Sequence, residues 1–259
     1  EVIQKYNPFI IFHTAAYKHV GLVENNKTES FYNNVIGTYV LIEACKNFKV
    51  KNFVNISTDK AVLPTTFMGA TKRVSEMLIQ ILFKKNNFTK FSIVRFGNVI
   101  GSSGSVIPLF IQQIKENKPL TVTDKNVRRY FMTISEAVQL VINSSFLNNK
   151  KFNIYVLDMG KQIKIYHIAR KIVKLCGFAI KDKSNPSGDV SIKIIGLKKG
   201  EKLSEEISLG RNLKITKNPK IMLCNENLDK SLKIAKLFKK NLDLGKFNKK
   251  SLEKILKFN

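Results

Sequence analysis

A hydroxyl, a carboxyl and an amine follow one another in the run Ser57-Thr58-Asp59-Lys60, at the end of an apolar, strand-like segment. Met68 and Lys72 come shortly afterwards, four residues apart in a segment of helical period, so they share one helix face. An acid and a base side by side suit general acid–base chemistry. A plainer interpretation fits the same residue types: Asp59 caps the next turn and the lysines are solvated surface groups.

Short apolar runs alternate with longer helical segments, which predicts an α/β fold with a parallel sheet covered by helices. Strands are expected at Phe9–His13, Phe53–Ser57, Phe91–Phe96 and Phe152–Leu157, with shorter extended pieces at Leu120–Thr123, Arg129–Thr133 and Ser191–Ile195. Helices are expected at Ser30–Phe48 (with Thr28 as cap), Phe67–Phe83, Val106–Asn117, Ser135–Leu147, Ile165–Cys176, Glu201–Ile207, Leu228–Leu237 and Leu252–Leu256. The candidate acid and base therefore fall at the carboxyl end of a strand, where such sheets bind ligands.

The composition is that of a folded globular protein, with 44% hydrophobic and 25% charged residues. A net charge of +26 would point to nucleic acid, but the basic residues are 39 Lys against 6 Arg and are spread along the chain. We therefore expect a solvated basic surface and no nucleic-acid partner. The three widely spaced cysteines form no metal-binding pattern, the histidines have no ligand partners at useful spacing, and no metal is expected.

The run STDKAVLPTTFMGATKR (Ser57–Arg73) closely resembles a signature of the extended short-chain dehydrogenase/reductase superfamily. Within it, the resemblance is to the capsular-polysaccharide group of nucleotide-sugar 4,6-dehydratases that act on UDP-N-acetylglucosamine. It continues in HTAAYKHVGLVENNKTESFYNNVIGTYVLIEACK (His13–Lys46), VRFGNVIGSSGSVIPLF (Val94–Phe110), VRRYFMTISEAVQLV (Val127–Val141), LDMG (Leu157–Gly160) and GLKKGEKLSEEI (Gly196–Ile207). Several motifs in order, over roughly Pro8 to Ile207, make it specific.

The resemblance implies a Rossmann-like, doubly wound sheet and a smaller C-terminal α/β substrate domain. The expected dinucleotide-binding part comprises residues 1–101 and 130–160, and the substrate part residues 102–129 and 161–259. The superfamily's first β-α-β unit, whose glycine-rich turn seats the cofactor pyrophosphate, does not precede Pro8. We therefore interpret the sequence as N-terminally truncated and expect these residues alone to bind NAD or NADP weakly or not at all.

The resemblance also implies catalytic roles. Asp59 is the expected acid that protonates the departing hydroxyl, Lys60 the base for the carbon-5 proton, and Thr58 the route for the carbon-4 proton. Lys72 is expected on the nicotinamide ribose. Met68 stands where other members of the superfamily have a tyrosine base, and a thioether cannot take a proton. The long-chain, membrane-anchored branch shares this methionine, so it favours that branch over an inactive enzyme.

The remaining expected contacts follow from the same resemblance. Residues expected at the tightly held cofactor are Ala15, Ala16, Tyr17, Lys18, Asn34, Ser57, Lys72 and Phe96. Residues expected at the sugar nucleotide are Lys18, Asn98, Ser105, Arg129 and Glu201, with Arg129 pairing with the diphosphate. Lys198, Lys199 and Ser204 depart from the usual pattern around Glu201, as Gly21 and Leu63 do elsewhere.

Two alternatives stay open at this stage: a C-4 epimerase of the same fold, and a non-catalytic remnant suggested by Met68 and the absent turn. The expected substrate is UDP-N-acetylglucosamine or a related UDP-sugar, and a homo-oligomer is compatible with the resemblance. No membrane contact is expected within this segment. The expected location is cytoplasmic, with a longer parent chain anchored to the bacterial inner membrane.

Overall fold

The computed structural model describes residues 1–83, 88–147, 152–208 and 213–226. They fall into two compact units. The first comprises Glu1–Phe96, Leu140–Asp158 and the described residues from Glu206 onward, and the second comprises Gly97–Gln139 and Met159–Glu205. No helix in the described ranges is long and apolar enough to cross a membrane.

A six-stranded sheet forms the centre of the first unit, in the order β1-β2-β3-β8-β13-β12. Its strands are β1 (Ile10–His13), β2 (Asn52–Thr58), β3 (Lys90–Phe96), β8 (Phe152–Leu157), β12 (Leu213–Ile215) and β13 (Ile221–Cys224). Neighbours among the first four are parallel, whereas β13 runs antiparallel to both β8 and β12. The predicted α/β fold with a mainly parallel sheet is therefore confirmed.

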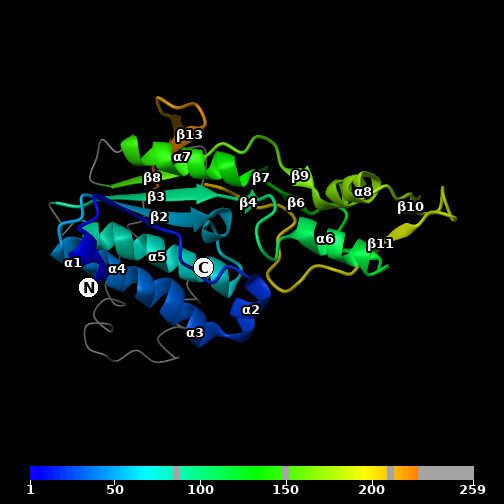
Figure 1. Cartoon of the computed structure of the whole chain (residues 1–259), viewed down its shortest axis with the longest axis horizontal. Helices are drawn as coiled ribbons and strands as arrows, with labels where there is room; N and C mark the ends of the chain where they lie inside the picture. Colours follow the sequence, from blue (N-terminus) through cyan, green and yellow to red (C-terminus); the bar gives the residue numbers. More distant parts are fainter. Residues whose placement is uncertain (84–87, 148–151, 209–212, 227–259) are drawn as a thin grey trace. The chain divides into compact units, whose positions relative to one another are not determined.

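Helices cover both faces of this sheet (Figure 1), with α4 and α5 on one face and α7 on the other. The helical elements of this unit are α1 (Val2–Tyr6), α2 (Val20–Asn25), α3 (Lys27–Phe31), a π-helical turn (Tyr32–Ile36), α4 (Gly37–Asn47), a 3₁₀ turn (Asp59–Ala61), α5 (Phe67–Phe83) and α7 (Ile134–Phe146), the last continuing from the second unit. Ile42, Phe53, Ile79, Phe91 and Val156 belong to one buried cluster between sheet and helices. Because β2 and β3 are buried on both faces, most of their side chains are apolar, although Asn55 and Ser92 are buried without a side-chain hydrogen-bond partner among the described residues.

The second unit is smaller. A three-stranded parallel sheet orders β10 (Ile180–Lys181), β11 (Val190–Ile194) and β5 (Leu120–Val122), and two further pairs join β4 (Asn98–Val99) to β7 (Phe131–Met132) and β6 (Arg128–Arg129) to β9 (Ile163–Lys164). Helices α6 (Val106–Lys115) and α8 (Ile165–Leu175) pack on it. Its core includes Phe110, Leu120, Ala169 and Val173.

Several expectations about local structure were wrong. Glu201–Ile207 is irregular, because Gly200 takes a φ of 77° and the carbonyl of Leu203 accepts from the Arg128 amide instead of bonding within a helix. Thr28 is not a cap, since α3 begins at Lys27 after Asn26. The single helix predicted over Ser30–Phe48 is interrupted by the π-helical turn.

The predicted boundary of the C-terminal part also differs from the structure. Strands β12 and β13 extend the sheet of the first unit, whereas residues 161–259 were expected to lie together in the substrate part. An antiparallel pair of strands can join the edge of a parallel sheet through backbone hydrogen bonds alone. No sequence motif is therefore needed for β12 and β13 to join the sheet, and none predicted that they would. The predicted helices Leu228–Leu237 and Leu252–Leu256 lie outside the described residues.

Candidate active site

The candidate acid and base lie in a tight turn where β2 ends. Strand β2 lies between β1 and β3, and β1 pairs with it only as far as Asn55, whereas β3 pairs with it up to Thr58. The 3₁₀ turn Asp59–Ala61 follows at once, and the Thr58 hydroxyl accepts a hydrogen bond from the Lys60 amide at 3.4 Å. Three consecutive polar side chains are thus presented at the carboxyl end of β2 by a hydrogen-bonded turn.

The carboxylate of Asp59 is the centre of this turn. Its Oδ1 accepts from Thr58 Oγ1 at 2.8 Å and from Lys60 Nζ at 2.9 Å. The side chain of Asp59 is fully buried, whereas that of Lys60 keeps 23% of its surface exposed. Oδ2 of Asp59 is buried and has no hydrogen-bond partner among the described residues. One carboxylate oxygen is therefore held by the turn, and the other is left for a further donor.

Helix α5 packs its first turn against this loop. A Cβ at Gly69 would overlap the carbonyl oxygen of Lys60, so only glycine allows this close approach. Met68 is buried at 5% exposure, beside Val23 and Phe67 in an apolar cluster. Lys72 lies one turn further along the helix at 6% exposure. The structure thus brings Asp59, Lys60, Met68 and Lys72 into one region of the first unit.

Lys72 is a buried cation in a polar layer between the sheet and the helices. Burial lowers its pKa to about 8, and the negative charge of Glu76 one turn away opposes that shift. Burial, with the charge of Lys72, also lowers the pKa of His13 to about 4, so His13 is neutral. Within the described residues the Lys72 ammonium makes no hydrogen bond. It is therefore free to bond hydroxyl groups of a bound molecule.

Asn34 connects this layer to the loop after β1. Its amide group accepts from the Tyr17 amide at 2.7 Å and donates to the Tyr17 carbonyl at 3.0 Å and to Thr71 Oγ1 at 3.1 Å. Asn34 lies in the π-helical turn, a rare geometry often found at functional sites. The Asn34 carbonyl accepts from the hydroxyls of Thr38 and Ser75. Asn34 thus supports the loop through Tyr17, as a structural residue would.

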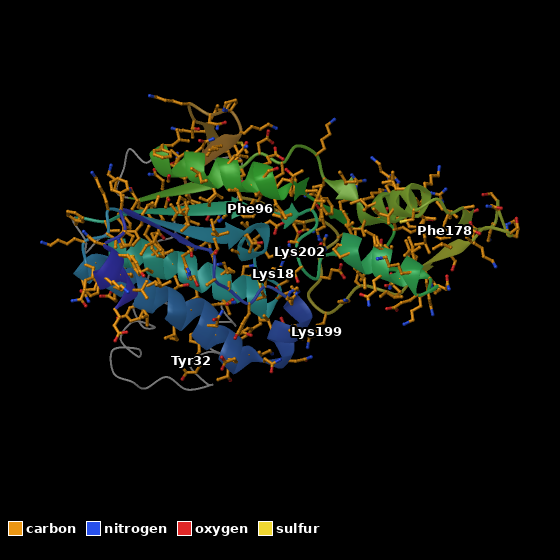
Figure 2. The ribbon with its side chains drawn as sticks, in the orientation of Figure 1. Lys18, Tyr32, Phe96, Phe178, Lys199 and Lys202 are labelled. Atoms are coloured by element: carbon orange, nitrogen blue, oxygen red, sulfur yellow. The ribbon has the colours of Figure 1, made fainter. Side chains whose placement is uncertain are left out.

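The other residues predicted at the cofactor lie in the loop after β1 or near the ends of β2 and β3. Ala15, Tyr17 and Lys18 are exposed in the loop between β1 and α2, Ala16 is half-buried there, and Phe96 is half-buried at the end of β3. Figure 2 labels Lys18 and Phe96, and shows Phe96 where the β3 arrow ends. Ser57 differs from them, because its hydroxyl donates to the buried Glu76 at 2.6 Å and is not free for a ligand.

Sequence reasoning missed the partners of Ser57. Glu76 on α5 is fully buried and bonds Arg95 from β3 and Arg73 from its own helix. Burial alone would raise the pKa of Glu76, but the two arginines hold it below its ordinary range. The sequence did contain an indication of a buried carboxylate: Arg95 lies within an apolar strand, and a buried arginine needs a carboxylate partner.

The second unit brings together two of its four predicted residues. Arg129, at 6% exposure, donates to the Arg128 carbonyl at 2.7 Å and lies 3.4 Å from Glu201 Oε1. The Glu201 carboxylate also accepts from Thr123 Oγ1 at 2.9 Å and from the Lys198 amide at 3.1 Å. The guanidinium group is therefore oriented by fixed acceptors and keeps donors for an anion.

Asn98 and Ser105 bound the glycine-rich loop of the same unit. The Asn98 amide donates to the Tyr130 carbonyl at 3.1 Å, which pairs β4 with β7. Gly101 and Gly104 take φ values of 75° and 65°, which side-chain-bearing residues avoid. The Ser105 amide donates to the Ser102 carbonyl, and Ser105 Oγ is buried without a hydrogen-bond partner among the described residues.

The mainly parallel sheet, with polar residues gathered at the carboxyl end of one of its strands, is a Rossmann-like fold, and the family comparisons agree with the short-chain dehydrogenase/reductase class. Residues 1–226 match the model of a family described as polysaccharide biosynthesis protein. The chain belongs to that family, and the predicted resemblance to the capsular-polysaccharide group is confirmed.

Among curated relatives, the chain is 46% identical over 207 residues to capsular polysaccharide biosynthesis protein CapD of Staphylococcus aureus, covering 80% of this chain and 33% of CapD. It is 34% identical to an inverting UDP-N-acetylglucosamine 4,6-dehydratase of Campylobacter jejuni (75% and 54% covered). It is also 34% identical to a UDP-glucose 4-epimerase of Rickettsia rickettsii (76% and 55% covered). The chain thus spans about a third to a half of the length of these relatives.

Solved structures agree on the fold. Pen from Bacillus thuringiensis is 35% identical, with a TM-score of 0.73 and 85% of this chain and 65% of that chain covered. The UDP-glucose 4-epimerase of Thermus thermophilus, solved with NAD, has a TM-score of 0.68 at 17% identity, covering 80% and 71%. The names of these relatives are those of a capsular polysaccharide biosynthesis protein, a nucleotide-sugar dehydratase and a nucleotide-sugar epimerase.

Proposed function

We propose that the protein is an NAD(P)-dependent UDP-N-acetylglucosamine 4,6-dehydratase of surface-polysaccharide synthesis, acting on the cytoplasmic side of the membrane. One observation carries the proposal: Asp59 and Lys60 form an acid–base pair at the end of a central strand, with Asp59 Oδ1 held by two donors and Oδ2 buried and unpaired among the described residues. Dehydration needs such a pair, because one group must protonate the leaving hydroxyl while another removes a carbon-bound proton.

The residues present fit a nicotinamide nucleotide. Lys72 offers a buried ammonium with no hydrogen bond inside the described chain, which suits the hydroxyls of the nicotinamide ribose. Ala15, Ala16 and Lys18, in the loop that Asn34 holds through Tyr17, are further proposed cofactor contacts. When bound, NAD(P)⁺ supplies the hydride acceptor and donor that the reaction needs.

The chain's own residues move the protons. The carbon-4 hydroxyl gives its proton to Thr58 Oγ1, which passes its own proton to Asp59 across their 2.8 Å hydrogen bond. Lys60 is the proposed base that takes the proton from carbon 5. Asp59 then protonates the hydroxyl at carbon 6, which leaves as water, and Lys60 returns its proton to carbon 5. Both residues end in the charge states in which they began.

Met68 fits this scheme because the first proton leaves through Thr58. The thioether is buried among apolar side chains and accepts no proton. In the second unit, Arg129 is the proposed partner of the sugar-nucleotide diphosphate, and Glu201, Asn98 and Ser105 are further proposed contacts. Lys18 would contribute a second cation for the phosphates.

The experiment supplies the full-length protein that contains these residues with NAD⁺ and UDP-N-acetylglucosamine in deuterium oxide. We expect a UDP-4-keto-6-deoxy sugar that carries deuterium at carbon 5, because Lys60 exchanges its proton with solvent. Asp59→Asn and Lys60→Met should each lower kcat about 10³-fold. The matched controls are Asp158→Asn and Lys220→Met, which alter an exposed ion pair and should leave the rate unchanged. Unchanged substrate would refute the proposal.

A C-4 epimerase is the second candidate, favoured by the equal identity to the Rickettsia rickettsii enzyme. It predicts UDP-N-acetylgalactosamine, of the same mass as the substrate and without deuterium at carbon 5. The same incubation therefore separates the two reactions.

A further inference from the structure

Four charged side chains form a buried cluster beneath the candidate acid–base turn. The buried charge cluster consists of Arg73 and Glu76 on α5, Arg95 on β3 and Glu226 just beyond β13. Their side chains are at most 9% exposed. Two positive and two negative charges balance, so the cluster can be buried without a net charge.

Each carboxylate in the cluster bonds both arginines. Arg95 donates Nε and Nη2 to Glu76, both at 2.7 Å, and Nη1 and Nη2 to Glu226. Arg73 Nη1 lies 3.0 Å from both Glu76 Oε2 and Glu226 Oε2. Because guanidinium and carboxylate groups are planar and bonded at several points, α5, β3 and Glu226, two residues beyond β13, are held in one geometry.

One further hydrogen bond leads from the cluster to the turn. Ser57 Oγ donates to Glu76 Oε1 at 2.6 Å, and Ser57 immediately precedes Thr58. Successive side chains of a strand point to opposite faces, so fixing Ser57 on the helix side also fixes the direction of Thr58. Glu76 thus connects the helix that carries Lys72 with the strand end that carries Thr58 and Asp59.

We propose that Glu76 is a positioning residue for the Thr58–Asp59–Lys60 turn, acting through Ser57, and that Arg73, Arg95 and Glu226 hold Glu76 in place. The inference deepens the proposed function and rests on it for its kinetic part. Buried ion pairs add little net stability compared with apolar residues of similar size, whereas their geometry is specific. Such a cluster beside a proton-transfer turn is therefore suited to fixing the position of reacting groups.

Ser57→Ala is the decisive variant, because it removes the link and leaves all four charges paired. In the full-length protein we expect kcat to fall at least tenfold while KM changes less than twofold, since misplaced catalytic groups impair the chemical step more than binding. Ser57→Thr, which keeps the hydroxyl, should restore most of the rate. The control is Ser144→Ala: Ser144 is also fully buried, but its hydroxyl donates to Val141 in its own helix.

Amide hydrogen exchange provides a readout that does not depend on activity. The Val62 amide donates to the Asp59 carbonyl at 3.0 Å and the Lys60 amide to Thr58 Oγ1, so both report on the turn. We expect their exchange to accelerate at least tenfold in Ser57→Ala relative to the amides of β3, and less than twofold in Ser144→Ala. Wild-type exchange at Lys60 and Val62 in Ser57→Ala would overturn the inference. If the wild type converts no UDP-sugar, the proposed function fails, and exchange still decides the positioning role.

Discussion

Asp59 and Glu76 are both fully buried carboxylates of the first unit, yet their surroundings differ. Glu76 accepts hydrogen bonds on both oxygens, from Ser57, Arg73 and Arg95. Asp59 accepts two on Oδ1, and its Oδ2 has no partner among the described residues. Since a buried oxygen without a partner is costly, the surroundings of Asp59 are less favourable to stability than those of Glu76, whose two oxygens are both paired.

Exchanging acid for amide at the two positions should therefore separate activity from stability. We expect Asp59→Asn to lower kcat about 10³-fold and to change the free energy of unfolding by less than about 1 kcal/mol. Glu76→Gln should lower that free energy by about 3–5 kcal/mol, because two buried guanidinium groups would then share one carboxylate. Steady-state kinetics and urea denaturation measure the two effects.

An Asp59→Asn protein that is as unstable as Glu76→Gln would contradict this contrast between the two carboxylates. Retained activity in Asp59→Asn would contradict the acid role. Glu43→Gln is the matched control for Glu76→Gln, because within the described residues Glu43 pairs with Lys46 alone and keeps 29% of its side chain exposed, and ion pairs open to solvent contribute about 0–1 kcal/mol.

Acid should weaken the buried charge cluster through Glu226. Burial alone would raise the pKa of Glu226, but hydrogen bonds and charge from Arg95 and Arg73 lower it from 4.5 to about 2. A lowered carboxylate pKa stabilises the folded state above the unfolded value, and this contribution is lost as pH falls from 4.5 towards 2. We expect Glu226→Gln to be about 3 kcal/mol less stable than wild type at pH 7, with the difference shrinking over that range.

Urea denaturation at pH 7, 5, 3 and 2 tests the sign as well as the size of this effect. Glu116→Gln provides the comparison, because Glu116 is a surface carboxylate paired with Lys118 and should alter the acid response little. A difference between Glu226→Gln and wild type that stays constant from pH 7 to pH 2 would show that the carboxylate charge is not what stabilises the cluster.

Gly69 links the two regions, because it lies on the helix that carries Glu76 and touches the turn that carries Asp59. A Cβ there would overlap the Lys60 carbonyl, so Gly69→Ala should cost about 1–3 kcal/mol of stability and lower kcat by displacing Lys60. Gly37→Ala is the matched control. Gly37 is also helical, and the atom nearest to a Cβ added there, the Tyr32 carbonyl oxygen, lies 3.7 Å away. There alanine should stabilise by about 0.5–1 kcal/mol. Equal effects at the two glycines would refute the close approach.

The Thr58–Asp59–Lys60 turn and the buried charge cluster also differ in how far the sequence predicts them. The strand before Thr58, the helix Phe67–Phe83 and the acid–base turn were predictable, because apolar period and the resemblance both mark them. The buried charge cluster could not be predicted, because Glu226 meets Arg95 only after β13 has joined the sheet antiparallel to β8. Glu226 and Arg95 are 131 positions apart in the sequence. Local patterns describe neighbours along the chain, whereas ion-pair partners depend on the final topology. For the same reason Glu201–Ile207 was wrongly predicted as helix, because its contacts with Arg128 are tertiary.

The smallest effect is expected at Leu63, where the turn's exit carries local strain. Leu63 takes a φ of 48° and is 51% exposed, so its side chain gains little from packing while its backbone lies in the left-handed region. Asparagine tolerates that region far better, and it occupies two of the other three non-glycine positions with positive φ in the described chain, Asn7 and Asn117. Leu63→Asn should therefore raise the free energy of unfolding by about 0.5–1 kcal/mol.

Thermal or urea denaturation of Leu63→Asn beside Leu197→Asn distinguishes backbone strain from a general benefit of removing exposed leucine. Leu197 is 45% exposed and has no positive φ, so its replacement should be close to neutral. Because the strain lies just beyond the 3₁₀ turn, relieving it should leave the pairing of Asp59 with Lys60 intact, and kcat should stay within about twofold of wild type. A stabilised Leu63→Asn protein with much lower kcat would instead show that the strain at this exit helps to hold the acid–base pair in its reactive geometry.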